Sequence, residues 1–128
     1  MAMALVEVLA GQPAAAKRDY LQGVRRALCA SLRIPDDDPT IRLIEHDRSD
    51  IVVPARFSDR YVIVTVTMFQ GRTLDTKRRL YQSLVAELGK LGVPADDVQV
   101  VLHEPPVENW SLGGIPASDV DPGFKINI

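Results

Sequence analysis

The stretch "GVPADDVQVVLHE", residues 92–104, resembles an earlier stretch of the same chain, "RIPDDDPTIRLIEH", residues 33–46. Both stretches contain an aliphatic residue before proline, an acidic turn, a run of strand-forming residues and a closing His and Glu. The echo extends upstream, where Gly11 recurs as Gly71. An internal repeat of this length indicates that each half is one supersecondary unit, which cannot bury its apolar face alone.

Each half is predicted to contain a strand, a helix and a second strand. Residues 61–68 alternate between two faces and are rich in β-branched residues, a period of two that is typical of a strand. Leucines at helical spacing follow and form one apolar stripe, made of Leu80, Leu84, Leu88 and Leu91. Thr73 is the expected N-cap of this helix, and Gly92 is its C-cap signal. The first helix is predicted from about Pro13 to Leu32, with the stripe Leu21, Val24, Leu28 and Leu32.

A strand–helix–strand crossover places its two strands parallel in one sheet. Two such units predict an α/β fold, in which a four-stranded sheet carries both helices on one face. We place the pseudo-repeats at residues 2–47 and 61–104 of a single domain, residues 1–128. The tail, residues 105–128, is rich in Pro and Gly and cannot form a core helix. It is expected to wrap a neighbouring chain or to close a pocket.

The second face of this sheet has no predicted cover. Its candidates carry too little charge for a solvated face: they are Tyr61, Ile63, Thr65 and Thr67, with either Ile41 and Leu43 or their strand neighbours. Such a face is usually buried against another copy of the chain, which predicts a homo-oligomer. The alternative is a monomeric, ferredoxin-like regulatory module, which requires the face to be solvated.

Composition narrows the class of protein. The chain is 46% hydrophobic and 25% charged, which is ordinary for a globular domain, and its net charge of -2 gives no electrostatic case for nucleic acid or an anionic membrane. No apolar run approaches the ~18 residues of a membrane span, and no secretory leader is evident, so the expected location is cytoplasmic. Cys29, the single cysteine, lies in a helical pattern, where a buried inert thiol is favoured over a nucleophile.

Familiar catalytic motifs are absent: there is no GxGxxG, no P-loop, no GxSxG and no metal-ligand spacing, so no cofactor or metal is expected. His46 and His103 end the second strand of each repeat, where a structural hydrogen bond is favoured over a catalytic role. Arg72, just before the N-cap of the second helix, is either solvated or part of an anion site with free backbone N–H groups.

Two further features permit both a structural and a functional interpretation. Asp36, Asp37 and Asp38 form either a solvated acidic turn or a turn that holds one carboxylate against a pocket. Trp110, the single tryptophan, lies in the irregular stretch "ENWSLGG". There it either anchors the loop or forms the wall of a pocket.

Taken together, the two repeats, "IPDDD", "IEH", "GRTLDTKRRLY" and "ENWSLGG" resemble the tautomerase superfamily, and its malonate semialdehyde decarboxylase branch most of all. The resemblance covers nearly the whole chain. It implies a β-α-β homotrimer with a pocket beside the start of the first strand. It also implies that an N-terminal proline, exposed by removal of the initiator Met, supplies a catalytic secondary amine.

Carried over by residue, the resemblance makes Asp38 the assisting carboxylate, Arg72 a ligand of the substrate carboxylate and Trp110 an aromatic of the pocket wall. Two positions depart from the family pattern. Gln70 stands where a second arginine is expected, so a hydrogen bond replaces a charge. Ala2 stands at the position of the proline, so removal of Met1 would leave a primary amine.

The resulting hypothesis is an enzyme that acts on a small oxo acid by decarboxylation, hydration or keto-enol tautomerisation. Arg72 would bind the substrate carboxylate, Asp38 would orient or activate water, and the N-terminal amine would stabilise negative charge. The alternative is a non-catalytic trimer of the same fold that binds a small acid or has a structural role. Neither nucleic acid nor a membrane is an expected partner.

Overall fold

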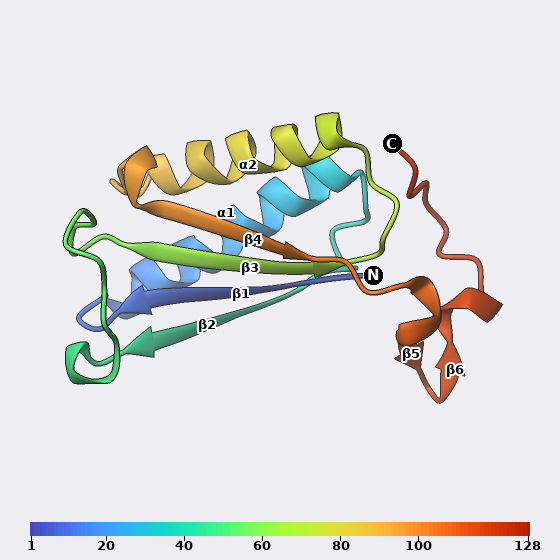
Figure 1. The fold of residues 1–128 in the computed structure, drawn as a ribbon, viewed down its shortest axis with the longest axis horizontal. Coiled ribbons are helices and arrows are strands. Elements are labelled where there is room, and N and C mark those ends of the chain that lie inside the picture. Colours follow the sequence, from blue (N-terminus) through green and yellow to red (C-terminus); the bar gives the residue numbers. More distant parts are fainter.

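The computed structural model describes residues 1–128 as one mixed sheet, two helices and a small C-terminal hairpin (Figure 1). The sheet strands are β1 (Ala2–Leu9), β2 (Thr40–His46), β3 (Val62–Met68) and β4 (Val98–His103). The helices are α1 (Ala14–Leu32) and α2 (Leu74–Gly89), and the hairpin is made of β5 (Ser111–Leu112) and β6 (Ile115–Pro116).

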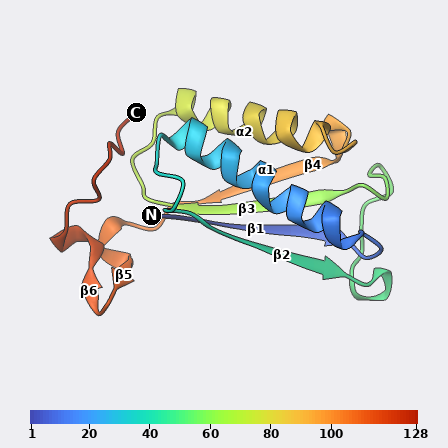
Figure 2. The same ribbon diagram turned by 180° about the vertical axis from the view of Figure 1, so that it is seen from behind.

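The order of strands across the sheet is β2-β1-β3-β4. β1 pairs with β2 in parallel, and β3 pairs with β4 in parallel, as a strand–helix–strand crossover requires. The two units meet through the antiparallel pair β1 and β3, in which Val6 lies opposite Val64. Both helices cover the same face of the sheet (Figures 1 and 2). The predicted four-stranded α/β fold is therefore confirmed.

The core lies between the sheet and the two helices. Alternate residues of the two central strands point into it, and they are packed against apolar residues of both helices, such as Leu28 and Leu84. Both leucines are fully buried, and each such side chain contributes about 1.5–3 kcal/mol through removal of apolar surface from water. The two helices also form an ion pair at their outer surface, where Arg26 Nη2 donates to Glu87 Oε2 at 2.9 Å.

The helix boundaries correct some details of the prediction. Pro13 is the N-cap of α1 and lies outside the helix. Val24, Leu28 and Leu32 are buried as predicted, but Tyr20 is buried in place of Leu21. The Thr73 cap is confirmed: its Oγ1 accepts from the Thr76 N–H at 3.2 Å. α2 ends earlier than predicted, at Gly89, and Gly92 instead forms the turn beyond it, with φ of +84°.

The opposite sheet face is not covered within one chain. Ile41 and Leu43 pack on the helix side, so their strand neighbours complete the open face; its apolar and hydroxyl residues are Met3, Leu5, Ile44, Ile63, Thr65, Thr67 and Val101. Tyr61 departs from the prediction, because it is buried under Phe57, whose ring stacks on it at 4.2 Å. Neither helix is long and apolar enough to cross a membrane.

Candidate active site

The site lies at the end of the sheet where β1 begins and β3 ends, beside the β5–β6 hairpin (Figures 1 and 2). A cavity of about 230 Å³ opens there. Met1, Asp38 and Phe69 line it from the sheet, and the C-terminal part of the chain supplies Leu112, Ile115, Ala117, Val120, Asp121, Pro122 and Phe124. A larger adjoining hollow of about 680 Å³ shares Met1 and Asp38 and adds Trp110 and Ala2. The tail thus closes a pocket, one of the two roles expected of it.

An amine and a carboxylate face each other in this cavity. The Met1 nitrogen lies 3.8 Å from Asp38 Oδ1, and Asp38 Oδ2 is buried with no hydrogen-bond partner. Burial lowers the pKa of the Met1 amine from its ordinary value of 8.0; the negative charge of Asp38 opposes that shift, and the positive charge of Arg72 adds to it. The uncharged amine is therefore more accessible near neutral pH than in an exposed terminus, and it can act as a base or a nucleophile.

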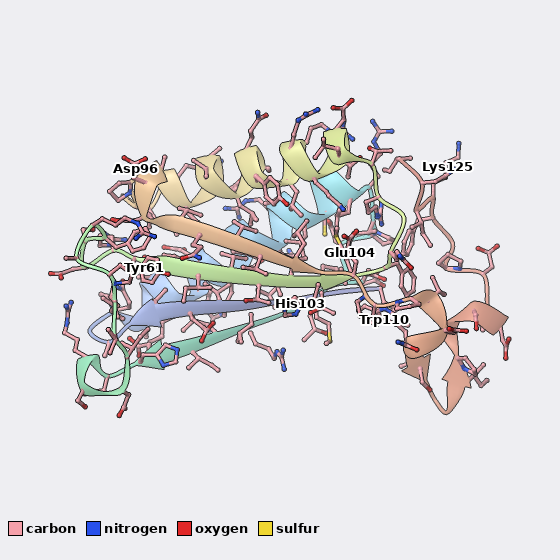
Figure 3. All side chains as sticks on the ribbon, viewed as in Figure 1. Tyr61, Asp96, His103, Glu104, Trp110 and Lys125 are labelled. Atoms are coloured by element: carbon pink, nitrogen blue, oxygen red, sulfur yellow. The ribbon has the colours of Figure 1, made fainter.

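Aromatic side chains form the wall of the site. Phe69, 2% exposed, contacts Trp110 edge to face at 5.3 Å between ring centroids and stacks with Phe124 at 6.3 Å. The Trp110 backbone holds its loop, because its N–H donates to Val107 O and its carbonyl accepts from Ala117 N–H. Trp110 therefore both anchors the loop and borders the hollow, and its side chain lies beside the root of the hairpin (Figure 3). Its indole Nε1 is buried and has no partner.

Arg72 is not solvated. It is 7% exposed, and its Nη1 donates to Leu32 O at 2.6 Å and to Lys125 O at 3.2 Å. Burial lowers the pKa of its guanidinium, which Asp38 partly offsets. Arg72 does not line the cavity, and the Phe124 ring lies 5.7 Å from the guanidinium carbon. Its charge reaches Met1 and Asp38, while its Nη1 donates to backbone carbonyls and its buried Nε has no partner.

The remaining sequence candidates are more dispersed. Ala2 is 3% exposed and pairs with Met68 in the sheet, whereas Gln70 is exposed and lines neither hollow. Among the three acids of the turn, Asp38 is half-buried and the other two are exposed. Only part of the predicted set therefore converges around the larger hollow: Ala2, Asp38 and Trp110.

Neither the histidines nor the cysteine lines either hollow. His46 Nε2 is 2.9 Å from Glu7 Oε1 at the other end of the sheet, and His103 is exposed at the end of β4. The thiol of Cys29 contacts Pro35 O at 3.6 Å, and burial raises its pKa, which disfavours the thiolate. These contacts agree with the structural interpretation of Cys29 and His46.

Most of the apolar wall was not predicted from the sequence. Phe69 carries one available signal, since it follows the last residue of a buried strand and precedes the turn at Gly71. Leu112, Ile115 and Phe124 have no periodic pattern around them, because they lie in a hairpin and an extended tail. Only the folded chain shows that these residues face Asp38.

Comparison with known proteins gives the family. The profile described as "Tautomerase enzyme" matches residues 38–113, and the chain belongs to this family. A probable tautomerase of Ralstonia nicotianae is 37% identical over 57 residues, which are 44% of this chain and 81% of that protein.

Solved structures share the fold over nearly the whole chain. FG41 malonate semialdehyde decarboxylase, inhibited by 3-bromopropiolate, is 29% identical with a TM-score of 0.81, over 91% of this chain and 92% of that one. A fused 4-OT wild-type symmetric trimer is 26% identical with a TM-score of 0.81, over 91% and 96% of the two chains. The resemblance to the tautomerase superfamily is thereby confirmed.

Proposed function

We propose that this protein catalyses proton transfer or decarboxylation on a small oxo acid in the cavity that Met1 and Asp38 line. The observation that carries the proposal is the amine–carboxylate pair, 3.8 Å apart, in a cavity with a largely apolar wall. An apolar wall strengthens the electrostatic effect of the two groups on a bound carbonyl compound. The lowered pKa of the amine brings its titration closer to neutral pH, where a general base is most effective.

Two reactions follow from this pair. In tautomerisation, the uncharged amine takes a proton from the carbon next to the carbonyl, and the resulting ammonium stabilises the enolate before the proton is returned. In decarboxylation of a 3-oxo acid, the electrons of the breaking C–C bond move to the carbonyl, CO₂ leaves, and the ammonium stabilises and then protonates the enolate. Asp38 favours the ammonium form, and its free Oδ2 can orient water for hydration.

The carboxylate of the substrate is assigned to Arg72, the buried cation whose charge acts on both Met1 and Asp38. Gln70 is exposed and lines neither hollow, so it is given only a secondary role as a hydrogen-bond donor. The likeness to FG41 malonate semialdehyde decarboxylase and to a probable tautomerase supports an oxo acid as the substrate class.

The assembly that we propose is a homotrimer. The open sheet face carries apolar residues such as Leu5, Ile63 and Val101, and a second copy of the chain would remove them from water. The fused 4-OT structure, a symmetric trimer, supports this arrangement. The same assembly serves the alternative function, a non-catalytic trimer that binds a small acid.

The test compares Asp38→Asn with Asp36→Asn, a matched change at an exposed acid of the same turn. Malonate semialdehyde and an enolisable 2-oxo acid are the substrates, and intact mass first establishes which residue carries the α-amine. We expect Asp38→Asn to lower kcat by ~10²-fold or more, the usual value of general acid–base help, and Asp36→Asn to leave it unchanged. Saturable binding without turnover in the wild type would instead establish the non-catalytic alternative.

A further inference from the structure

The last residues of the chain lie on the loop that leads into α2. We call residues 124–128 the C-terminal strap. A backbone oxygen of Ile128 accepts from the Thr73 N–H at 2.8 Å, and the Lys125 carbonyl accepts from Arg72 Nη1 at 3.2 Å. The strap thus binds the N-cap of a 16-residue helix and the guanidinium beside it with two backbone oxygens.

Close packing accompanies these hydrogen bonds. Gly71 has φ of +116°, and a Cβ at this position would lie 3.3 Å from Ile126 Cγ2, so the strap occupies the space that a side chain would fill. The Phe124 ring lies 5.7 Å from the guanidinium carbon of Arg72 and also lines the cavity. The strap therefore separates Arg72 from the cavity that contains Asp38.

Both strap oxygens occupy positions that suit an anion, because backbone N–H groups at a helix N-terminus and a guanidinium are the usual ligands of a carboxylate. Ile128, the last residue of the sequence, already presents a carboxylate oxygen to Thr73, whereas Arg72 meets only the neutral carbonyl of Lys125. The buried Nε of Arg72 has no partner at all. A small carboxylate could therefore satisfy more of the Arg72 guanidinium than the strap does.

We propose that the C-terminal strap is an autoinhibitory segment, which a small carboxylate displaces from Arg72 and Thr73 when it binds. This inference rests on the proposed function, in which Arg72 receives the substrate carboxylate. The strap is suited to movement, since Lys125 and Asn127 are exposed and Gly123, with φ of +80°, precedes it as a hinge. The closed strap also explains why Arg72 does not line the cavity.

Trypsin provides a direct test, because Lys125 is exposed and lies within the strap (Figure 3). Cleavage after Lys125 removes residues 126–128 and is followed by intact mass. Propionate is the probe, with propionamide as a neutral control and chloride at equal ionic strength. We expect propionate to accelerate this cleavage about fivefold or more, the lower end of typical coupling between two events, and propionamide to have no effect. Slower or unchanged cleavage in propionate would overturn the proposal.

A second test leaves Arg72 intact. Ile126→Ala loosens the strap at Gly71, and Asn127→Ala is the matched control on an exposed strap side chain. Propionate binding is read from the fluorescence of Trp110, the single tryptophan, which borders the site. We expect Ile126→Ala to bind propionate about fivefold more tightly and Asn127→Ala to bind it as the wild type does. Equal affinity in all three proteins would contradict an inhibitory strap.

These outcomes separate the strap from the proposed function. If propionate releases the strap but no oxo acid is turned over, the strap proposal holds and the catalytic one fails. If oxo acids are turned over while Ile126→Ala neither binds propionate more tightly nor lowers KM, the proposed function holds and the strap is only structural.

Discussion

Asp38 and Asp97 occupy equivalent positions in the two repeats, yet only Asp38 faces a cavity. Asp97 is 4% exposed and both of its oxygens are used: Oδ1 accepts from Ser58 N–H at 2.9 Å, and Oδ2 accepts from the Ser58 hydroxyl. Asp38 meets the Met1 amine at 3.8 Å and leaves Oδ2 without a partner. The connection that precedes β3 occupies the space beside Asp97. The corresponding space beside Asp38, just before β1, is open to the cavity. Only the first of the two repeats therefore carries a carboxylate that is free to act on a ligand in the cavity.

This difference predicts opposite effects on stability. Asp97→Ala removes the buried carboxylate that accepts from the Ser58 N–H and hydroxyl, and hydrogen bonds to a charged group contribute about 1.5–3 kcal/mol, so stability is expected to fall by about that amount. Asp38→Ala removes a half-buried carboxylate with one unsatisfied oxygen, so stability is expected to stay level or to rise. Urea unfolding at equal protein concentration measures the free energy of unfolding of each variant and of the wild type. Equal losses would mean that Asp38 is as structural as Asp97.

Asp38 should also control the titration of the α-amine. Burial lowers the pKa of the Met1 amine, and Asp38 opposes this shift because its negative charge favours the ammonium. Asp38→Asn removes that opposition, so the pKa should fall further and the uncharged amine should persist to lower pH. The pKa of the α-amine is measured from the pH dependence of its acylation rate, followed by mass spectrometry, in protein that retains Met1. An unchanged pKa in Asp38→Asn would show that the two groups do not interact.

The repeat is what made the fold predictable. The alternation in β3, the leucine stripe of α2 and the proline-broken helix ends are local patterns, and each recurs in the other half. Each half also contains an equivalent ion pair: Lys17 Nζ lies 2.6 Å from Glu45, and Lys77 Nζ lies 2.8 Å from Glu104. The sequence could not show which of the neighbouring residues Tyr20 and Leu21 enters the core, because both are large and both suit a core.

The site was less predictable because it depends on contacts between distant segments. Asp38 and Trp110 were found through the family resemblance, and the structure brings both to the same hollow. The burial of Arg72 could not be foreseen, since its carbonyl partners come from Leu32 and Lys125. No pattern in the irregular tail indicates which backbone oxygen meets a distant guanidinium.

The open sheet face predicts an assembly that a single charge disrupts. Thr65 lies near the middle of this face, opposite Leu5 on one side and Val101 on the other. Thr65→Lys would place an unpaired charge in the proposed trimer interface, where its desolvation is costly. The matched control is Gln82→Lys, on the exposed surface of α2.

Light scattering should give three times 14.1 kDa for the wild type and for Gln82→Lys, and a smaller mass for Thr65→Lys at micromolar concentration. A wild-type monomer under these conditions would favour the regulatory-module interpretation. A trimeric Thr65→Lys would place the interface on another surface.

Ala2→Pro tests whether the departure from the family pattern limits activity. Ala2 begins β1, and proline is tolerated at the first residue of a strand. The position is almost fully buried, so the larger ring can cost about 1–3 kcal/mol of stability through overpacking. Mass spectrometry must come first, because proline exposes a secondary amine only after Met1 is removed.

In correctly processed Ala2→Pro, the secondary amine should take the place of the Met1 amine near Asp38. Turnover of an enolisable 2-oxo acid or of malonate semialdehyde should then rise about tenfold or more, below the usual range for general acid–base help. Gly is the matched control, since Ala2→Gly also permits Met1 removal but leaves a primary amine. If Ala2→Pro turns over substrate no faster than Ala2→Gly, the exposed Gln70 is the next residue to change, because the family pattern has an arginine there. No gain from Ala2→Pro combined with Gln70→Arg would favour the non-catalytic trimer, since amine, carboxylate and cations would then all be present without turnover.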